Sequence, residues 1–272
     1  MAIDVGSETV EPDALRQVLT LGELHLEGRL VDASNATWRC QAELDGVLVA
    51  CVYKPRRGER PLWDFPTGSL GNREVSAYHV SDALGWGLVP MTVWRDSGPA
   101  GAGMCQQWIE VDEAAVHVDI VPEGRVPPGW RHVLDATDGF GDPVSLVHSD
   151  ALELRRMAAF DAVINNADRK GRHVLSGADS SIRAVDHGVA FNEDDKLRTV
   201  LWGWAGEPLD GGIADDLSRL EADFGAELEE RLAEHLSVSE IRRTRSRLRR
   251  LLRDGVFPLP GEGWPPLPWP AF

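Results

Sequence analysis

The sequence predicts an α+β protein with two unequal lobes, a small β-rich lobe over residues 21–110 and a larger, mainly helical lobe over residues 111–257. Three observations predict this class. Residues 24–53 have a strand-like pattern, in which the first two segments alternate apolar and polar side chains. A single helical segment interrupts the strand patterns of the first part, and helical spacing dominates from about residue 151 onward. With 43% hydrophobic and 26% charged residues, the 272-residue chain has an ordinary globular composition and can bury a substantial core.

The first lobe is expected to hold strands around one helix. Residues 1–20 form a lead-in or a short helix. LHLEGRLV and TWRCQAEL alternate, and Asp45-Gly46 makes a tight turn before VLVACVYK. REVSAYHVSDALG has helical spacing, and Gly85 is suited to end that helix. GLVPMTVWR and MCQQWIEV predict two further strands.

The second lobe is expected to consist mainly of helices. Residues 121–143 are rich in Gly, Pro and Asp, which predicts a connecting or inserted loop. Residues 151–165 have core-type side chains at intervals of three and four, which predicts a helix, and SIRAVD predicts a short strand. A helix or helix pair is expected over residues 217–253. Residues 258–272 form a Pro/Trp-rich tail that either packs against the body of the protein or binds a partner.

Charge, hydropathy and cysteine content disfavour several classes of function. The formal net charge of −16 disfavours nucleic-acid binding and adhesion to anionic membranes, because both need surplus Lys and Arg. No run of about 20 apolar residues is present, so no transmembrane segment is expected. Cys40, Cys51 and Cys105 lack metal-binding spacing and are expected to be free, buried thiols, which favours a reducing cytoplasm.

The cations are almost all arginine, which makes the lysines notable. Lys and Arg total 28, but only Lys54, Lys170 and Lys196 are lysine. Lys54 ends a strand that is apolar on both faces, so it is expected to lie at a buried position and to need an anionic partner. A lysine there suits the α- and β-phosphates of a nucleotide, and a strand-end lysine that reaches water is the competing interpretation.

Acidic and amide side chains follow Lys54 in an order that suits phosphate chemistry. Glu74 begins the next helix and either pairs with Lys54 or stabilises the helix N-terminus. Asn166 and Asp168 follow an apolar helix, where an aspartate can orient an attacking hydroxyl. Asp186 ends a short strand, where a carboxylate suits Mg²⁺. Turn chemistry explains each aspartate alone, so the prediction depends on the order of all of them.

Three stretches resemble the phosphatidylinositol 3-/4-kinase-like family, most closely type II phosphatidylinositol 4-kinases and related actinobacterial proteins: NREVSAYHVSDALGWGLVP, DAVINNADRKGRHVL and VDHGVAF. HipA-like kinases share a looser pattern of an Asn-x-Asp loop and a later strand-end aspartate. The resemblance spans residues 22–205 and implies a two-lobed protein- or lipid-kinase-like fold.

The resemblance implies roles for individual residues. Lys54 would contact the ATP phosphates with Glu74 as its partner, Asp168 would be the catalytic aspartate with Asn166 beside it, and Asp186 would bind the metal. The turn over the phosphates and the adenine-contacting segment would be formed by Ser34, Asn35, Ala36 and Thr37, and by Gln107, Trp108 and Glu110.

One position departs from the family pattern. His173 stands where the family has a second metal-binding asparagine, and a neutral imidazole is a poor ligand for Mg²⁺. His173 would then contact a phosphate oxygen, bind the softer Mn²⁺, or mark a weakened enzyme.

The leading hypothesis is an ATP-dependent phosphotransferase that uses Mg²⁺ or Mn²⁺ and acts on a lipid or protein hydroxyl. A nucleotide-binding pseudokinase that regulates a partner, or an enzyme that transfers a nucleotidyl group, are the alternatives. The arginine-rich segment 242–253 is expected to be a solvated helix face, with contact to an anionic partner as the alternative.

Overall fold

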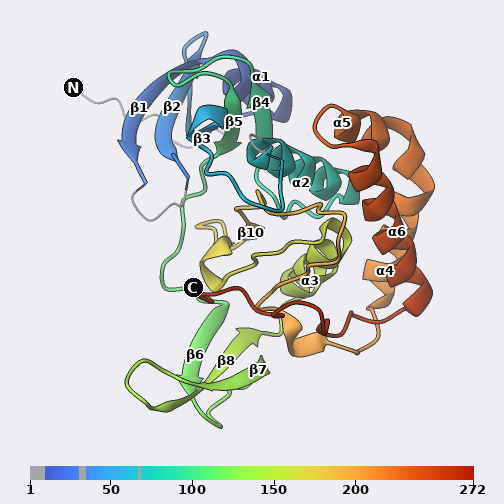
Figure 1. Cartoon of the computed structure of the whole chain (residues 1–272). Helices are drawn as coiled ribbons and strands as arrows, with labels where there is room; N and C mark the ends of the chain where they lie inside the picture. The colour runs from blue at the N-terminus through green and yellow to red at the C-terminus, as the bar shows by residue number, and fades with distance from the viewer. Residues whose placement is uncertain (1–9, 31–34, 67–68) are drawn as a thin grey trace. The chain divides into compact units, whose positions relative to one another are not determined.

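The computed structural model describes residues 10–30, 35–66 and 69–272, and the chain divides into two compact units (Figure 1). Unit 1 comprises the residues up to Pro61 together with Met91–Trp108, and unit 2 comprises Leu62–Pro90 and Ile109–Phe272. Both units contain antiparallel strands as well as helices, which confirms the predicted α+β class.

Unit 1 is a five-stranded antiparallel sheet with one helix against it. The strand order is β1-β2-β3-β5-β4. Helix α1 (Pro12–Leu21) shares a buried cluster with the sheet, so the short helix is the correct alternative for the described part of the predicted lead-in. A short 3₁₀ helix, η1 (Arg56–Gly58), follows the third strand. The strands are β1 (Glu23–Arg29), β2 (Trp38–Leu44), β3 (Val47–Pro55), β4 (Thr92–Arg95) and β5 (Gly103–Gln107).

The three cysteines lie in the core of unit 1. Cys40, Cys51 and Cys105 are free and fully buried, as predicted, and Cys40 is directly opposite Cys51 in the β2–β3 pair. Hydrogen bonds between neighbouring thiols, together with burial, raise the pKa of Cys40 and of Cys51. They are therefore core side chains rather than reactive nucleophiles.

Unit 2 contains the remaining helices and two small sheets. A π-helical turn, η4 (Phe224–Leu228), joins two of the helices, and the 3₁₀ helices are η2 (Gly171–His173) and η3 (Trp202–Trp204). The two-stranded sheet pairs β9 (Val174–Ser176) with β10 (Ile182–Ala184). In the described part of the chain, no helix has both the length and the apolar character needed to cross a bilayer. The helices are α2 (Leu70–Leu84), α3 (Leu152–Ile164), α4 (Gly211–Asp223), α5 (Glu229–Ala233) and α6 (Val238–Asp254).

The predicted loop over residues 121–143 is wrong. This region contains one whole strand and the ends of two others in a three-stranded antiparallel sheet with the order β6-β8-β7. The strands are β6 (Val118–Pro122), β7 (Trp130–Thr137) and β8 (Pro143–Ser149). Most of the Gly, Pro and Asp residues that suggested a loop lie in the turns between these strands, where Gly124, Gly129 and Gly141 have positive φ. Only the central strand β8 is mostly buried, so the two edge strands lack a strong apolar pattern.

Helix α2 begins three residues before the predicted segment and ends at Gly85, whose φ of 68° confirms the predicted cap. The predicted first lobe included this helix, whereas Leu62–Pro90 forms part of unit 2. The physical reason is that α2 is buried on nearly all of its faces and bonds later segments. Trp86 just beyond it, for example, donates from Nε1 to Asp216 of α4 at 2.7 Å.

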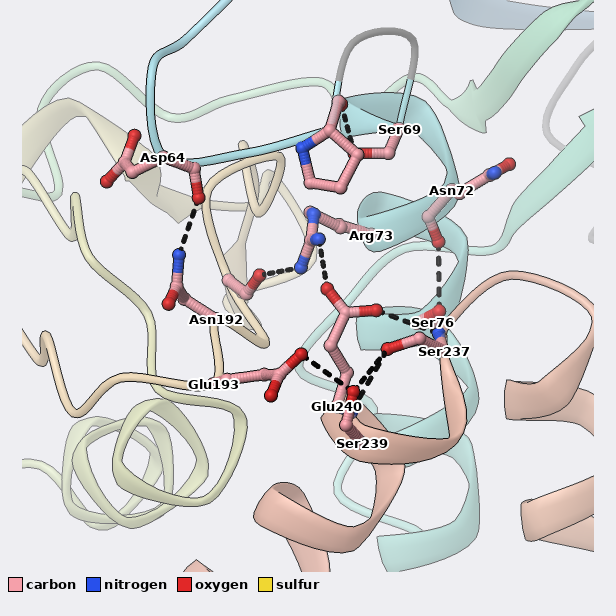
Figure 2. Close-up of polar contacts among 12 residues, drawn as sticks. Asp64, Ser69, Asn72, Arg73, Ser76, Asn192, Glu193, Ser237, Ser239 and Glu240 are labelled. Atoms are coloured by element: carbon pink, nitrogen blue, oxygen red, sulfur yellow. Dashed lines mark hydrogen bonds and ion pairs between the residues drawn. The ribbon is translucent and has the colours of Figure 1, made fainter.

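Figure 2 shows how a buried ion pair joins α2 to the start of α6. Arg73 pairs with Glu240 and also donates from Nη1 to the backbone oxygen of Ala190 at 2.6 Å. Glu240 completes a capping box, since its Oε2 accepts from Ser237 N at 2.8 Å while Ser237 Oγ accepts from Glu240 N. One carboxylate therefore caps α6 and holds α2, and through Arg73 it holds the segment after Asp186.

Candidate active site

The candidate site begins where α3 ends. Asn165 has a left-handed conformation (φ 55°, ψ 53°) and terminates the helix. Its Nδ2 donates to the backbone oxygens of Asn192 and Asp194, and its Oδ1 accepts from Lys196 N at 2.8 Å. These bonds fix the start of the loop against residues 192–196.

Asn166 is fully buried, and both ends of its amide bond protein groups. Nδ2 donates to Asp161 Oδ1 at 3.0 Å, and Oδ1 accepts from the backbone N of Asp168 at 3.0 Å. The second bond is an Asx turn that fixes the backbone of Asp168. This geometry makes Asn166 a residue that positions Asp168, whereas the family resemblance placed it beside Asp168 in the catalytic site.

The side chain of Arg169 ties three segments together inside unit 2. Arg169 and Asp161 are both fully buried and form a bidentate ion pair, with Nε–Oδ2 and Nη2–Oδ1 distances of 2.8 and 2.9 Å. Arg169 Nη1 donates to the backbone oxygens of His173 and Val185 at 3.2 and 3.0 Å. Because Arg169 follows Asp168 and Val185 precedes Asp186, one guanidinium holds both acidic loops in place.

His187 links this arrangement to helix α2. Its Nε2 lies 2.7 Å from Arg169 Nη2, and arginine can only donate, so His187 is a neutral imidazole that accepts at Nε2. The backbone N of His187 donates to Glu74 Oε2 at 3.3 Å. Glu74, which is 2% exposed, therefore orients the loop that carries Asp186.

Asp168 lies in a partly desolvated position within this framework. Its side chain is 31% exposed, and Lys170 Nζ lies 3.4 Å from its Oδ2. Burial raises the pKa of Asp168 above its ordinary value, the Asp186 carboxylate adds to the increase, and Lys170 and Arg198 oppose it. A carboxylate with a raised pKa beside a lysine suits acceptance of a proton from a hydroxyl.

Asp186 is the more exposed of the two carboxylates, and its backbone has a φ of 60°. A left-handed aspartate is uncommon and is often found at functional sites. His173 Nε2 lies 3.4 Å from Asp186 Oδ2, so the two predicted metal ligands are neighbours. In residues 10–30, 35–66 and 69–272, no group of three or more His, Cys, Asp or Glu side chains is arranged to hold a metal ion.

No family model matches the chain. Protein Rv2133c of Mycobacterium tuberculosis (strain ATCC 25618 / H37Rv) is 50% identical over 264 residues, which cover 94% of each chain. The chain belongs to the family of Protein Rv2133c. At this identity over nearly the full length, members of the Rv2133c family are expected to share one fold.

In this Rv2133c family member, the predicted nucleotide contacts of unit 1 lie at the ends of its strands. Lys54 is partly buried on β3 opposite Met104 of β5. Asn35 Oδ1 accepts from Arg60 N at 2.8 Å, and Ala36 N donates to Gly58 O, so the turn after β1 bonds the segment after β3. Thr37 is buried and donates from Oγ1 to Asn35 O. Ser34 lies outside the described residues.

The predicted adenine-contacting segment is divided between the two units. The backbone N atoms of Gln107 and Trp108 donate to Met91 O and Ala50 O at 2.9 Å, which fixes them to the unit 1 sheet. Glu110 belongs to unit 2, where its backbone oxygen accepts from Ala178 N at 2.9 Å. The pairing of Lys54 with Glu74 also joins residues of different units and stays a prediction.

The Pro/Trp-rich tail packs against the body of unit 2, which is one of the two predicted alternatives. Pro266 O accepts from Thr199 N and from Trp202 Nε1, at 3.0 and 2.9 Å. Ala271 O accepts from Gly171 N at 2.8 Å, and a Cβ on Gly171 would clash with the ring of Phe272. The tail therefore contacts the loop that carries Asp168, and Gly171 is needed for this close approach.

Asp161 is one of the core-type positions of the helix predicted over residues 151–165, and the sequence-based prediction gave it no part in the candidate site. The signal was available, because a carboxylate at a core position of an apolar helix needs a buried cationic partner. No comparable signal identified the tail contacts, since they are hydrogen bonds to backbone oxygens between segments 64 to 100 residues apart.

Proposed function

We propose that this protein is an ATP-dependent phosphotransferase with a kinase-like two-lobed fold. The observation that carries the proposal is the Arg169–Asp161 pair, which fixes Asp168 and Asp186 on neighbouring loops. The order of motifs along the chain and the geometry of this framework support the same interpretation, since phosphoryl transfer depends on positioning and charge stabilisation.

Each side chain has a distinct task in this proposal. Asp168 accepts or orients the proton of the attacking hydroxyl, and burial supports that task by raising its pKa. Asn166 and Arg169 position Asp168 and do not contact the substrate, because both are fully buried within the protein. Lys54 neutralises phosphate charge, and Glu74 orients the Asp186 loop through His187.

The donor set near Asp186 fits a cation that is held largely by phosphate oxygens. Mg²⁺ is commonly bound by one or two carboxylates together with substrate phosphates, and Asp186 offers a carboxylate that is 48% exposed. When bound, the ion would neutralise charge on the transferred phosphoryl group. His173 beside Asp186 makes Mn²⁺ the better fit of the two metals, since imidazole suits softer ions.

The ATP contacts proposed for the rest of the chain are Asn35, Thr37, Gln107, Trp108 and Glu110, and Ser34 is proposed on sequence alone. The acceptor is a lipid or protein hydroxyl. The net charge of −16 favours a protein acceptor over an anionic bilayer surface.

The second candidate is a nucleotide-binding regulator without turnover. The observation that favours it is the imidazole of His173 at 3.4 Å from Asp186, because a protonated His173 would compete with a metal ion for that carboxylate.

The test uses purified protein, ATP labelled at the γ-phosphate, Mg²⁺ or Mn²⁺, and panels of lipid and protein acceptors. We expect transfer of the label by the wild type, and its loss in Asp168→Asn with ATP-induced thermal stabilisation retained. Asp142→Asn, in an exposed turn, is the matched control and keeps activity.

Three other outcomes distinguish the alternatives. Stabilisation by ATP without transfer under either metal would overturn the enzyme and support the regulator. Transfer of label only from the α-phosphate, in a parallel reaction with ATP labelled there, would indicate nucleotidyl transfer. ATP binding that is unchanged in both Lys54→Ala and Asp186→Ala would overturn the proposed nucleotide site.

A further inference from the structure

Unit 2 contains a cavity of about 590 Å³ that shares Asn165 with the candidate active site but none of that site's carboxylates. Its walls come from α3, from the segment around Lys196 and Trp202, from α6, and from residues 256–264 of the tail. Neither Asp168, His173 nor Asp186 is among the residues that line it in the described chain. A volume of this size lies within the range of small-molecule sites, roughly 300–1,000 Å³.

Arg247 of α6 supplies a buried, incompletely bonded cation at this cavity. The residue is 4% exposed; its Nε donates to Asp195 Oδ1 at 2.8 Å, and its Nη2 donates to the backbone oxygens of Asn192 and Glu193. Its Nη1 is buried and has no hydrogen-bond partner among the residues that the structure describes. A buried guanidinium N–H without an acceptor is costly, so a ligand atom that accepts there would bind favourably.

The charges around the cavity favour a ligand that carries a single negative charge. Asp195 is shared by two guanidinium groups, since Arg250 Nη1 lies 2.8 Å from its Oδ2. The other charged lining residues are balanced, because Lys196 pairs with Asp64 and Asp254 pairs with Arg253. One positive charge therefore remains uncompensated at the Arg247 side, in a chain whose net charge is −16.

Most of the remaining lining is apolar. It includes Leu197, Leu251, Phe257 and Pro258, and two tryptophans, Trp202 and Trp264. Trp264 stacks on Trp63 at a centroid distance of 5.9 Å, and Lys196 Nζ lies over both rings, so the tail side of the cavity is held in place. An apolar wall with one convergent cation is the pattern of a site for an amphipathic anion.

We propose that this cavity binds a small amphipathic carboxylate, with the carboxylate accepting from Arg247 Nη1 and an apolar body against Leu251, Phe257 and Trp264. The inference is independent of the proposed phosphotransfer, because it uses none of the residues assigned to that reaction.

The test is calorimetric titration of the full chain with octanoate, octan-1-ol and acetate as probes. We expect octanoate to bind roughly 10-fold or more tightly than octan-1-ol, as a charge-assisted hydrogen bond would give. Acetate, which lacks the apolar body, is expected to bind at least as weakly as octan-1-ol.

Three variants locate the site. Arg247→Met is expected to remove the preference for octanoate over octan-1-ol, and Ala162→Phe, which adds bulk from α3, is expected to abolish binding of both. Arg247 also bonds Asp195 and the backbone oxygens of residues 192 and 193, so its replacement can disturb the fold. Arg250→Gln is therefore added as a milder variant, which is expected to weaken octanoate binding several-fold. Arg249→Gln is the matched control, because this arginine of the same helix pairs with Glu221 and does not line the cavity.

The proposal is overturned if octanoate and octan-1-ol bind equally, if octanoate does not bind, or if Ala162→Phe and Arg250→Gln bind octanoate as the wild type does. An equal loss in Arg249→Gln would show a general charge effect and would also overturn it.

Discussion

Replacing Asp161 by asparagine is expected to destabilise the protein far more than loss of an ordinary ion pair. Asp161 and Arg169 have fully buried side chains, so Asp161→Asn leaves the Arg169 charge without a counter-charge inside unit 2. Breaking a buried pair by removing one partner costs about 3–5 kcal/mol. The loss is a large share of a typical free energy of unfolding, roughly 5–15 kcal/mol.

The substitution removes the charge with almost no change in side-chain volume. The introduced amide keeps one oxygen that can accept from Asn166 Nδ2, but its NH2 group cannot accept from Arg169 Nε, so one acceptor is lost together with the charge. The assay is urea unfolding followed by far-ultraviolet circular dichroism and tryptophan fluorescence, in which the midpoint falls while the slope stays constant.

Two controls make this reasoning refutable. Asp179→Asn removes the exposed i,i+4 partner of Arg183 and is expected to cost at most about 1 kcal/mol. The double variant Asp161→Leu/Arg169→Met removes both charges and is expected to be less destabilised than Asp161→Asn, since no buried charge is left unpaired. The reasoning is refuted if Asp161→Asn unfolds at the midpoint of Asp179→Asn, or if the double variant is the least stable of the three.

Three further perturbations follow from particular contacts. Burial lowers the pKa of His148 to about 4, so the folded state favours the neutral imidazole. The free energy of unfolding is therefore expected to fall by up to roughly 3 kcal/mol as the pH drops from 6.5 to 4, and thermal melts of His148→Gln should depend less on pH. Gly171→Ala places a Cβ against the Phe272 ring and should increase amide hydrogen exchange of residues 264–272, whereas the control Gly139→Ala, whose Cβ would meet no atom within 4 Å, should not. Unchanged exchange in Gly171→Ala would show that the ring contact does not hold the tail. Ser237→Ala removes the side-chain half of the capping box and should lower the free energy of unfolding by about 1 kcal/mol in urea titrations, and a neutral result would mean that Glu240 alone caps α6.

Elements with strong local patterns could be predicted from the sequence. Strand β2 alternates, β3 is a continuous apolar run, and the two flank the Asp45-Gly46 turn. Helices α2 and α3 end at left-handed residues, Gly85 and Asn165. In each case the decisive information lies within about ten consecutive residues, because periodicity and capping are local properties.

The β6-β8-β7 sheet was not predicted, because its formation depends on pairing between strands rather than on a local pattern. Strand β7 has no buried residue in its burial pattern, so its sequence resembles a loop, and only pairing with β8 makes it a strand. Strand propensity depends on such neighbours more than helix propensity does.

The same distinction between local patterns and contacts that only the fold creates applies to the candidate site. The order of Asp168 and Asp186 is a sequence property, and the effect of the Asp186 carboxylate on the pKa of Asp168 agrees with their expected proximity. The supporting role of Asn166 depends instead on its burial and on two hydrogen bonds that no local pattern contains.

The scarcity of lysine has a practical consequence for labelling chemistry. All three lysines lie in the described chain, and none of their side chains is fully exposed, since Lys54 and Lys170 are partly buried and Lys196 is 3% exposed. Reagents that acylate amines should therefore modify the folded protein at few sites. Mass spectrometry of the peptide that contains Lys54 can then measure whether added nucleotide protects this lysine from the reagent. Few other side-chain amines compete for the reagent.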